Sequence, residues 1–392
     1  MSWPLVKIDE VCQKVTDGSH NPPKGIDLSI HLMLSSKNIF DDQINFDSPR
    51  YLTKIDFNNE NKRTDINVGD VLLTIVGTVG RSAVVKEEHG KFTLQRSVAV
   101  LKPNEKIISR FLMYCLQNMV QVLVSNSRGV AQKGIYLKQI KELEIPLPPL
   151  EEQKRIAGIL DKADAIRQKR KQAIQLADDF LRSVFLDMFG DPVTNPKGFP
   201  IGTIRDFVET ANYGSSGKAS ETEGEYPMLR MGNITYQGGW DFTNLKYIDL
   251  NEKDKPKYLT KKGDLLFNRT NSKELVGKTA VFEENKPMAI AGYLVRVRTN
   301  ELGNNYYISA YLNSSHGKQT LVGMCKSIVG MANINAQELQ NIKIALPPLE
   351  LQNKFENIVK QTKSRLQKHD DSDKSIQQLF NSLSQKAFAG DL

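Results

Sequence analysis

The feature that most constrains this chain of 392 residues is an internal repeat. The segment Leu147-Pro148-Pro149-Leu150-Glu151-Glu152-Gln153 returns as Leu346-Pro347-Pro348-Leu349-Glu350-Leu351-Gln352, and Gly190-Asp191 returns as Gly390-Asp391. A self-similar chain of this length predicts two copies of one structural unit, each with a buried core. Two equivalent surfaces at a fixed separation suit a long, repetitive or two-part target.

The chain divides into four segments that alternate in character. Residues 1–150 and 190–349 carry short β-branched runs and short helical patterns, whereas residues 151–189 and 350–392 each have the spacing of one long helix. The run that begins at Gly69-Asp70 matches the run that begins at Gly263-Asp264. We therefore predict an α+β fold, in which two mixed α/β domains are separated by two long helices. The exposed loops differ between the copies, so their recognition surfaces are expected to differ.

Two prolines precede each long helix, and each helix has a narrow stripe of apolar residues at helical spacing. Neither stripe could support a helix of this length alone, so we expect the two helices to pair as an antiparallel coiled coil with a pseudo-twofold relation. The alternative is that each helix packs on its own domain. The predicted seam consists of Ile156, Ile159, Ile166, Arg170, Phe180, Phe355, Ile358, His369, Ile376 and Leu379.

Two polar residues, Arg170 and His369, take equivalent places in this seam. They could set the register of the helices, or they could reach water from the edge of the seam. About 39 residues of helix span roughly 58 Å. That length corresponds to roughly 17 base pairs of duplex DNA, which would accommodate two short contact sites with unread base pairs between them.

Composition narrows the class of protein without fixing it. The net charge of +8 is compatible with a polyanionic partner, but a surplus of this size is weak support on its own. The sequence has no run of about 18 apolar residues and no signal-peptide pattern, so we expect a cytoplasmic protein without a membrane segment. Three scattered cysteines, Cys12, Cys115 and Cys325, do not form a disulfide framework or a zinc site and are expected to be apolar fillers.

Apparent enzyme motifs are incomplete. Asn21-Pro22-Pro23-Lys24 resembles an amino-methyltransferase signature, but it has lysine in place of the aromatic residue. Gly277-Lys278-Thr279 resembles the end of a phosphate-binding loop, but Ser272 stands where the first glycine belongs. The five histidines show no metal-ligand spacing. We expect no catalytic centre and no metal site.

The repeat resembles the specificity subunit of type I restriction–modification systems, and the resemblance covers essentially the whole chain. It lies in the two proline-started helices and in Asp17-Gly18-Ser19-His20-Asn21-Pro22-Pro23-Lys24, and also in glycine-bearing loops at Gly129-Val130-Ala131-Gln132 and Gly330-Met331-Ala332-Asn333. The second domain departs from the pattern, because Tyr213-Gly214-Ser215-Ser216-Gly217-Lys218 replaces the first of these loops.

The resemblance implies a protein without catalysis of its own. Residues 1–150 would be target recognition domain 1 and residues 190–349 target recognition domain 2, with the conserved helices 151–189 and 350–392 as spacers. Its partners would be double-stranded DNA with a bipartite asymmetric target, two modification (methyltransferase) subunits and restriction (endonuclease/translocase) subunits. S-adenosylmethionine, ATP and Mg would belong to those subunits. The alternative is a DNA-binding scaffold of another defence or transcriptional assembly.

Loops that mix Arg, Lys, Asn, Gln, Ser and Thr with glycine can contact both base edges and phosphates. On that ground we predict DNA-binding residues in both domains. In the first domain they are Ser19, His20, Asn21, Lys24, Thr78, Arg81, Gln95, Arg96, Arg128, Gln132 and Lys133. In the second they are Ser215, Ser216, Lys218, Arg230, Asn233, Asn268, Arg269, Asn271, Lys273, Lys278, Lys326 and Asn333.

Overall fold

The computed structural model describes residues 3–127, 134–273, 275–328, 331–367, 382–383, 385–386 and 388. The chain forms two compact units. The first consists of Met1–Arg170 and Asp370–Leu392, and the second of Lys171–His369. Each unit therefore combines one predicted recognition domain with the beginning of one long helix and the end of the other.

The first unit is built on an antiparallel sheet in the order β2-β10-β7-β8. Its strands are β1 (Leu5–Lys7), β2 (Cys12–Asp17), β3 (Leu32–Leu34), β4 (Ile39–Phe40), β5 (Gln43–Ile44), β6 (Arg50–Tyr51), β7 (Val71–Thr74), β8 (Ser82–Val84), β9 (Phe92–Leu94), β10 (Val98–Pro103) and β11 (Glu144–Pro146). Its helices are α1 (Ile8–Val11), α2 (Lys54–Thr64), α3 (Ser109–Asn118), α4 (Val120–Ser125), α5 (Leu137–Lys141) and the first part of α6 (Leu150–Phe189).

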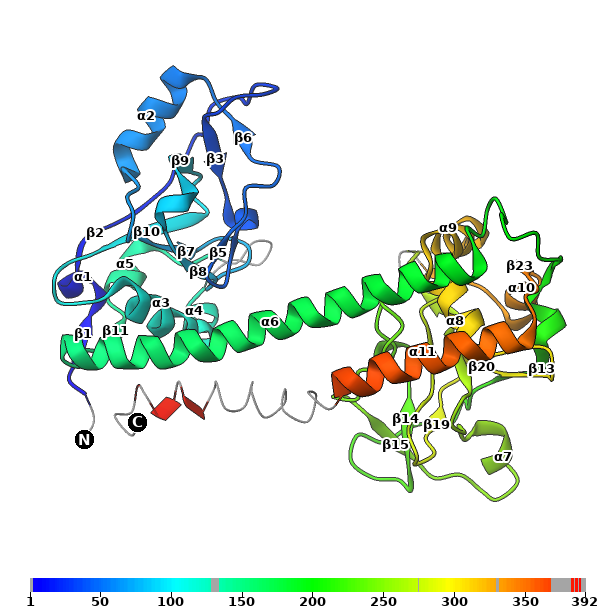
Figure 1. The fold of residues 1–392 in the computed structure, drawn as a ribbon. Helices are drawn as coiled ribbons and strands as arrows, with labels where there is room; N and C mark the ends of the chain where they lie inside the picture. Colours follow the sequence, from blue (N-terminus) through cyan, green and yellow to red (C-terminus); the bar gives the residue numbers. More distant parts are fainter. Residues whose placement is uncertain are drawn as a thin grey trace. The chain divides into compact units, whose positions relative to one another are not determined.

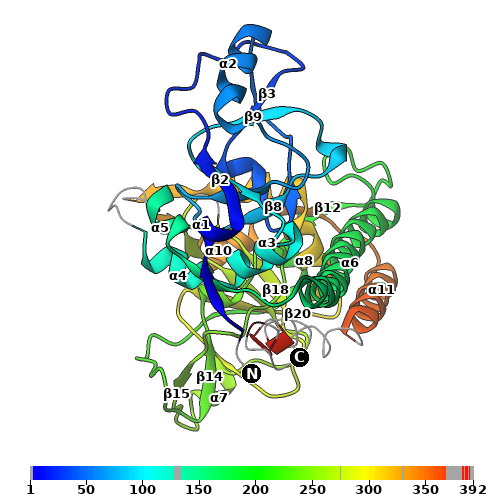
Figure 2. The same cartoon turned by 90° about the vertical axis from the view of Figure 1, so that its left-hand side faces the viewer.

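Helix α3 packs on β7 and β8 and forms the centre of the main core of this unit (Figure 1). Six consecutive residues of α3, Phe111 to Leu116, are buried. A second, smaller sheet has the order β6-β3-β9, and α2 packs against β9 (Figure 2). The strands of the two sheets fix the two ends of each loop that connects them.

The second unit repeats this plan. Its four-stranded sheet has the order β13-β20-β16-β18, and its smaller sheet has the order β15-β14-β19. The strands are β12 (Ile201–Thr203), β13 (Val208–Tyr213), β14 (Tyr226–Leu229), β15 (Lys246–Ile248), β16 (Leu265–Asn268), β17 (Thr270–Asn271), β18 (Thr279–Val281), β19 (Ala289–Ile290), β20 (Leu294–Thr299), β21 (Lys326–Ile328), β22 (Met331–Asn333) and β23 (Lys343–Ala345). The helices are α7 (Lys255–Tyr258), α8 (Asn305–Asn313), α9 (Ser315–Met324), α10 (Ala336–Gln340), the last part of α6, and α11 (Leu349–Gln367).

The repeated Gly-Asp pair has a structural role in both units. The Asp70 carboxylate accepts the backbone N–H of Asn67 and pairs with Lys102, 2.6 Å away on β10. The Asp264 carboxylate likewise accepts a backbone N–H and pairs with Arg298, 2.7 Å away on β20. Because each aspartate is almost fully buried, its basic partner compensates for a charge that would otherwise be costly.

The glutamine of the proline motif locks the start of each long helix to its own domain. Gln153 is fully buried, accepts the Ile108 N–H at 2.9 Å, and donates to the carbonyls of Lys106 at 3.0 Å and Pro148 at 2.9 Å. Its amide thus satisfies two backbone groups just before α3 and one just before α6. We call this set of three bonds the glutamine clamp.

The second unit repeats the glutamine clamp group for group. Gln352 accepts the Asn304 N–H at 2.9 Å and donates to the carbonyls of Leu302 at 3.0 Å and Pro347 at 2.8 Å. The clamp explains why the motif requires glutamine at this place. A side chain with both an acceptor and two donors is needed, and glutamine supplies them without a charge.

The places of Ile166 and Phe180 in the helix seam stay predictions. Ile166 and Phe180 are 53% and 50% exposed. In the first part of α6 the buried residues are Ile156, which is a predicted seam residue, together with Ala157 and Leu160, and Ile156 and Leu160 pack in the core of the first unit. Packing against the domain core therefore buries Ala157 and Leu160 in addition to a residue that the spacing selected.

Within the second unit, the last part of α6 lies antiparallel to α11 (Figure 1). Phe185 and Phe355 have ring centroids 5.7 Å apart, and Phe189 also packs on Phe355. Further back along α6, burial raises the pKa of Asp178 and the Lys363 ammonium of α11 opposes that rise. Ile159 and Ile358 are both half-buried. Exposed residues lie near each of them on its helix. The antiparallel direction is therefore confirmed for these parts of the two helices.

The end of the second long helix belongs to the first unit. Leu383 and Phe388 pack against its core, and the Phe388 ring lies 5.7 Å from that of Phe111 on α3. The second unit has a matching contact, in which Phe189 lies 4.6 Å from Tyr307 on α8. His369, Ile376 and Leu379 lie outside the described residues, so their predicted places in the seam stay predictions, as does the twofold relation.

Candidate nucleic-acid interface

The first predicted loop is anchored by a close approach of two backbones. A Cβ at Gly18 would lie 2.1 Å from the carbonyl oxygen of Leu94, so only glycine fits. The Ser19 N–H donates to the same carbonyl at 2.8 Å, and the Arg96 N–H donates to the Ser19 carbonyl at 2.8 Å. Ser19 is buried, whereas His20 and Arg96 are exposed. The fold therefore brings the predicted residues Ser19, His20, Gln95 and Arg96 together.

A residue that the sequence did not suggest joins this cluster. Arg63, at the end of α2, pairs with the buried Asp17 carboxylate and also donates from Nε to the Asp17 carbonyl at 3.0 Å. Asp17 in turn holds the His20 ring, with 2.8 Å between Oδ2 and Nε2. His20 and Arg63 thus present half-exposed side chains oriented by one buried carboxylate. No local sequence signal links residues so far apart along the chain.

The remainder of this loop is exposed and braced by a single arginine. Asn21 and Lys24 both face solvent. Arg50 on β6 donates from Nη1 to the Pro23 carbonyl at 2.8 Å. The Asn-Pro-Pro sequence is therefore part of a surface loop, as expected for a structural turn, and its polar side chains remain available for contacts.

Thr78 and Arg81 form a separate site around the turn that precedes β8. Thr78 is exposed, and its carbonyl accepts the Thr74 hydroxyl. The Arg81 guanidinium lies over the ring of Phe40 at 5.0 Å. Arg128, Gln132 and Lys133 lie outside the described residues.

The second domain keeps the anchor of the first loop although its sequence departs from the family pattern. A Cβ at Gly214 would lie 2.3 Å from the carbonyl oxygen of Ala291, and the Ser215 N–H donates to the Ile290 carbonyl at 2.7 Å. Ser216 and Lys218 follow on the exposed part of the loop. The Gly-Ser pair is the shared structural element, and the residues after it are free to differ.

A second cluster joins this loop to the β17-β22 pair. The Arg269 guanidinium lies 4.9 Å from the ring centroid of Tyr213 and donates to Asn333 Oδ1 at 3.3 Å. The Arg269 N–H also donates to the Tyr293 carbonyl at 3.0 Å, next to the anchor of the first loop. Tyr213 and Tyr293 are 40% and 52% exposed and were not predicted. Predicted residues Arg269 and Asn333 are therefore brought together with Ser215, and Asn271 is their neighbour on β17.

Three other predicted residues have side chains that are hydrogen-bonded or buried within the domain. Asn233 is buried, accepts the Arg230 N–H at 2.9 Å and donates to the Asp241 carbonyl at 2.8 Å. Asn38 makes the equivalent bonds in the first domain, which indicates a turn-forming role for both. Arg230 donates from Nη2 to the Asn244 carbonyl at 2.7 Å. Asn268 is fully buried at the end of β16, and its side-chain amide has no hydrogen-bond partner among the described residues.

Basic residues complete the surface of the second domain. Lys273 is exposed and Lys278 is partly buried, and burial lowers the pKa of Lys278. The side chain of Lys326 lies outside the described residues. DNA contact by any of the predicted residues stays a prediction, and the exposed clusters around His20 and around Arg269 are the places where several of them meet.

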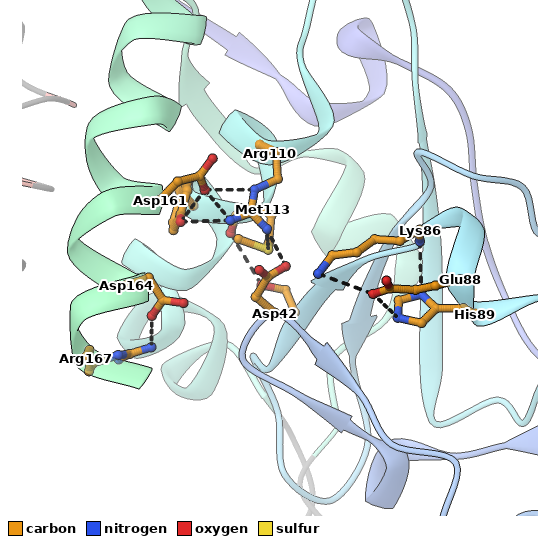
Figure 3. Close-up of polar contacts among 11 residues, drawn as sticks. Asp42, Lys86, Glu88, His89, Arg110, Met113, Asp161, Asp164 and Arg167 are labelled. Atoms are coloured by element: carbon orange, nitrogen blue, oxygen red, sulfur yellow. Dashed lines mark hydrogen bonds and ion pairs between the residues drawn. The ribbon is translucent and has the colours of Figure 1, made fainter. Parts of the chain in front are cut away.

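A polar joint connects the first recognition domain to its long helix. Figure 3 shows Arg110 of α3 between Asp42, in the β4–β5 turn, and Asp161 of α6. Arg110 Nε donates to Asp161 at 2.9 Å, and the Tyr114 hydroxyl donates to the same carboxylate at 2.7 Å. One turn further along α6, Asp164 pairs with Arg167 at 2.6 Å.

The corresponding joint of the second unit has the opposite polarity. Lys360 and Lys363 of α11 stand where α6 has its two aspartates. Lys363 pairs with Glu283, and Lys360 lies 5.3 Å from the ring centroid of Tyr306. Burial raises the pKa of Tyr306, and Glu283, which accepts its hydroxyl at 2.8 Å, raises it further. The long helix therefore contributes acidic residues to the first joint, from α6, and basic residues to the second joint, from α11.

The described residues contain no group of three His, Cys, Asp or Glu side chains arranged to hold a metal ion. Among the described helices, none combines the length and apolar character needed to cross a membrane. The fold and the clusters together define a protein with two related recognition domains joined by long helices.

Comparison with known families assigns this class. The sequence profile of the family described as "Type I restriction modification DNA specificity domain" matches residues 3–176 and 196–378, one match for each copy of the repeat. The chain therefore belongs to this family of DNA specificity domains. The resemblance inferred from the repeat and the α+β fold class are both confirmed.

Two curated relatives illustrate the similarity. The chain is 30% identical over 168 residues to the putative type I restriction enzyme MjaX specificity subunit of Methanocaldococcus jannaschii, an alignment that covers 42% of this chain and 39% of that protein. It is 24% identical over 340 residues to the type I restriction enzyme EcoKI specificity subunit of Escherichia coli, covering 80% and 72%. A crystal structure of the type I restriction–modification S subunit from M. genitalium shares the fold, with a TM-score of 0.60, 15% identity and coverage of 99% and 96%.

Proposed function

We propose that this chain reads a bipartite, asymmetric DNA target, with one half-site for each recognition domain. The observation that carries the proposal is the repeated anchor of the first loop. Gly18-Ser19 and Gly214-Ser215 are held by the same backbone contacts, whereas the exposed residues that follow are His20-Asn21 in one domain and Ser216-Gly217 in the other. One scaffold with two different sets of exposed donors and acceptors is suited to reading two different short sequences.

The chemistry would come from other polypeptides. Two modification subunits would bind the long helices, and restriction subunits would join them to form the nuclease. S-adenosylmethionine, ATP and Mg²⁺ would be bound by those subunits. Exposed apolar side chains on more than one side of α6 support this part of the proposal, because Ile166, Ile174 and Leu176 are 53%, 40% and 68% exposed and offer partners apolar surface to cover.

The decisive experiment is to produce the full chain together with its type I modification subunit in a host without adenine methylation and to sequence the methylated adenines. The expected result is one motif with two defined halves and a constant gap. A contiguous motif, or methylation without sequence preference, would contradict the proposal. The purified chain alone should neither methylate nor cut DNA.

A second experiment separates this proposal from a DNA-binding scaffold of another assembly. Four residues inserted in the middle of α6 add roughly 6 Å, close to two base pairs of duplex DNA. The unread gap should lengthen while both half-sites stay the same. Four residues inserted in the exposed turn at 251–253 are the matched control and should leave the gap unchanged. Changed half-sites after the helix insertion would show that the helix does not set the spacing.

A further inference from the structure

A small basic hollow in the second unit contains Lys278, a predicted DNA-binding residue, and two residues that the sequence did not suggest, Tyr236 and Lys318. Tyr236, Lys278 and Lys318 line it, together with Val276, Gly277 and Val322. The Lys318 ammonium lies 3.5 Å from the ring centroid of Tyr236 and donates to the Tyr236 carbonyl at 2.9 Å. The hollow is shallow and open to solvent, so an anion could reach it from outside.

The two lysines of this hollow lack a counter-charge. Within the described part of the chain, neither Lys278 nor Lys318 forms an ion pair with a carboxylate. Burial lowers the pKa of both ammonium groups, and the nearby Arg182 of α6 lowers that of Lys318 further. Lys278 and Lys318 are partly dehydrated cations that line the same hollow, and such groups favour an anion beside them.

The first unit has a related arrangement at the equivalent place. Arg81 and Lys278 each come directly before a buried strand, β8 or β18, and their carbonyls accept the N–H of Thr74 and Asn268 at the end of the paired strand. The β4–β5 hairpin of the first unit carries Phe40 under Arg81. The matching hairpin of the second unit, closed by the bridge between Ile234 and Trp240, carries Tyr236.

The cation beside an aromatic ring in both domains indicates which part of a DNA target these residues contact. The two domains differ in the exposed residues of their first loops, so the property common to both sites, a cation beside a partly exposed aromatic ring, does not distinguish two base sequences. The part of a DNA target that is the same at both half-sites is the sugar–phosphate backbone. A basic side chain beside an aromatic ring suits this part, because the ring packs against the sugar while the cation faces the phosphate.

We propose that Lys278 and Lys318, beside Tyr236, form a contact site for a phosphate of the DNA backbone, and that Arg81 beside Phe40 is its counterpart in the first domain. This inference rests on the proposed function and adds the part of the DNA that these residues bind. The two lysines would fix the position of the second domain on the duplex, while the cluster around Arg269 and Asn333 would face the bases.

The test uses the complex of the full chain with its modification subunit. The DNA is a duplex that contains the motif identified by sequencing the methylated adenines. The variant is K278A combined with K318A, and binding is measured at several salt concentrations. Each lost phosphate contact should reduce the slope of log affinity against log salt by about 0.9. The affinity should fall by a similar factor for the cognate duplex and for a duplex with one changed half-site, so that the specificity ratio is unchanged.

Two matched variants make the result interpretable. K253A removes an exposed lysine of the same domain away from the hollow and should leave the salt slope as it is in the wild type. K318R keeps a positive charge over the Tyr236 ring and should retain most of the slope. Thermal unfolding of the double variant within a few degrees of the wild type shows that the domain is folded.

Three outcomes would overturn the inference. A wild-type complex that binds the motif specifically while the folded double variant keeps the full salt slope excludes a phosphate contact and leaves the proposed function intact. Loss of the modification subunit from the double variant in size-exclusion chromatography assigns the hollow to a protein partner instead. A wild-type complex without sequence-specific binding overturns both the proposed function and this inference.

Discussion

Replacing Gln153 by alanine tests the glutamine clamp. The substitution removes one acceptor and two donors and leaves the Ile108 N–H and the carbonyls of Lys106 and Pro148 buried without partners. A buried polar group left unsatisfied costs about 1–3 kcal/mol. Water entering the vacated space satisfies part of this demand, so we expect a loss of about 3 kcal/mol in the free energy of unfolding of the first unit. For a unit of this size, that corresponds to a fall in Tm of roughly 6–12 °C.

Hydrogen–deuterium exchange measured by mass spectrometry localises the effect. The Ile108 amide should exchange about a hundredfold faster in the variant, because about 3 kcal/mol corresponds to that factor. The peptide that spans residues 104–112 reports on this amide. The peptide that spans residues 300–308 contains the equivalent loop of the second unit and is an internal control, since its own clamp through Gln352 is intact.

The mirror variant and an exposed neighbour complete the experiment. Q352A should accelerate exchange in residues 300–308 and leave residues 104–112 unchanged. E151A removes an 86% exposed side chain from the same helical turn and should change neither peptide. Equal acceleration in both loops, or less than a tenfold change after Q153A, would refute the reasoning that each clamp acts locally on its own domain.

Three further predictions concern buried and paired groups. Asp264→Asn leaves two arginines of β20 without their carboxylate and should lower the free energy of urea unfolding by about 3 kcal/mol. Lys363→Glu should lower Tm by a few degrees through repulsion from Glu283, and adding Glu283→Lys should restore it, as a double-mutant cycle would show. Burial raises the pKa of the Cys115 thiol much more than that of Cys325, so iodoacetamide at pH 8 should label Cys325 at least about tenfold faster in the native protein.

The architecture could be predicted because its signals are local and occur twice. The proline-started helices, the Gly-Asp pairs and the Gly-Ser anchors all stand in the sequence at matching places, and each has the same contacts in both units. The helix seam was less predictable. Ile156 fits the helical spacing and is buried, but Ala157 and Leu160 are buried as well, because the shape of the domain core decides which residues are covered.

The candidate interface was predictable in part for a similar reason. Loop residues with glycine neighbours, such as His20 and Lys218, are exposed where the sequence placed them. Asn233 has the same composition signal, but its amide is used to close a turn. Arg63 and Lys318 were missed because they reach their sites from helices distant in the sequence, and nothing in their own neighbourhood indicates the partner.

The opposite polarity of the two joints bears on how such chains can be recombined. A chimera that exchanges a recognition domain at the prolines would bring a foreign α3 residue to Asp161, and a domain taken from the second copy would supply Tyr306 where Arg110 is required. A crossover placed after Asp164 in α6, or after Lys363 in α11, would transfer each domain with its own half of the joint. Domain shuffling in this family of subunits should therefore tolerate boundaries about four turns inside the helices better than boundaries at their first residues.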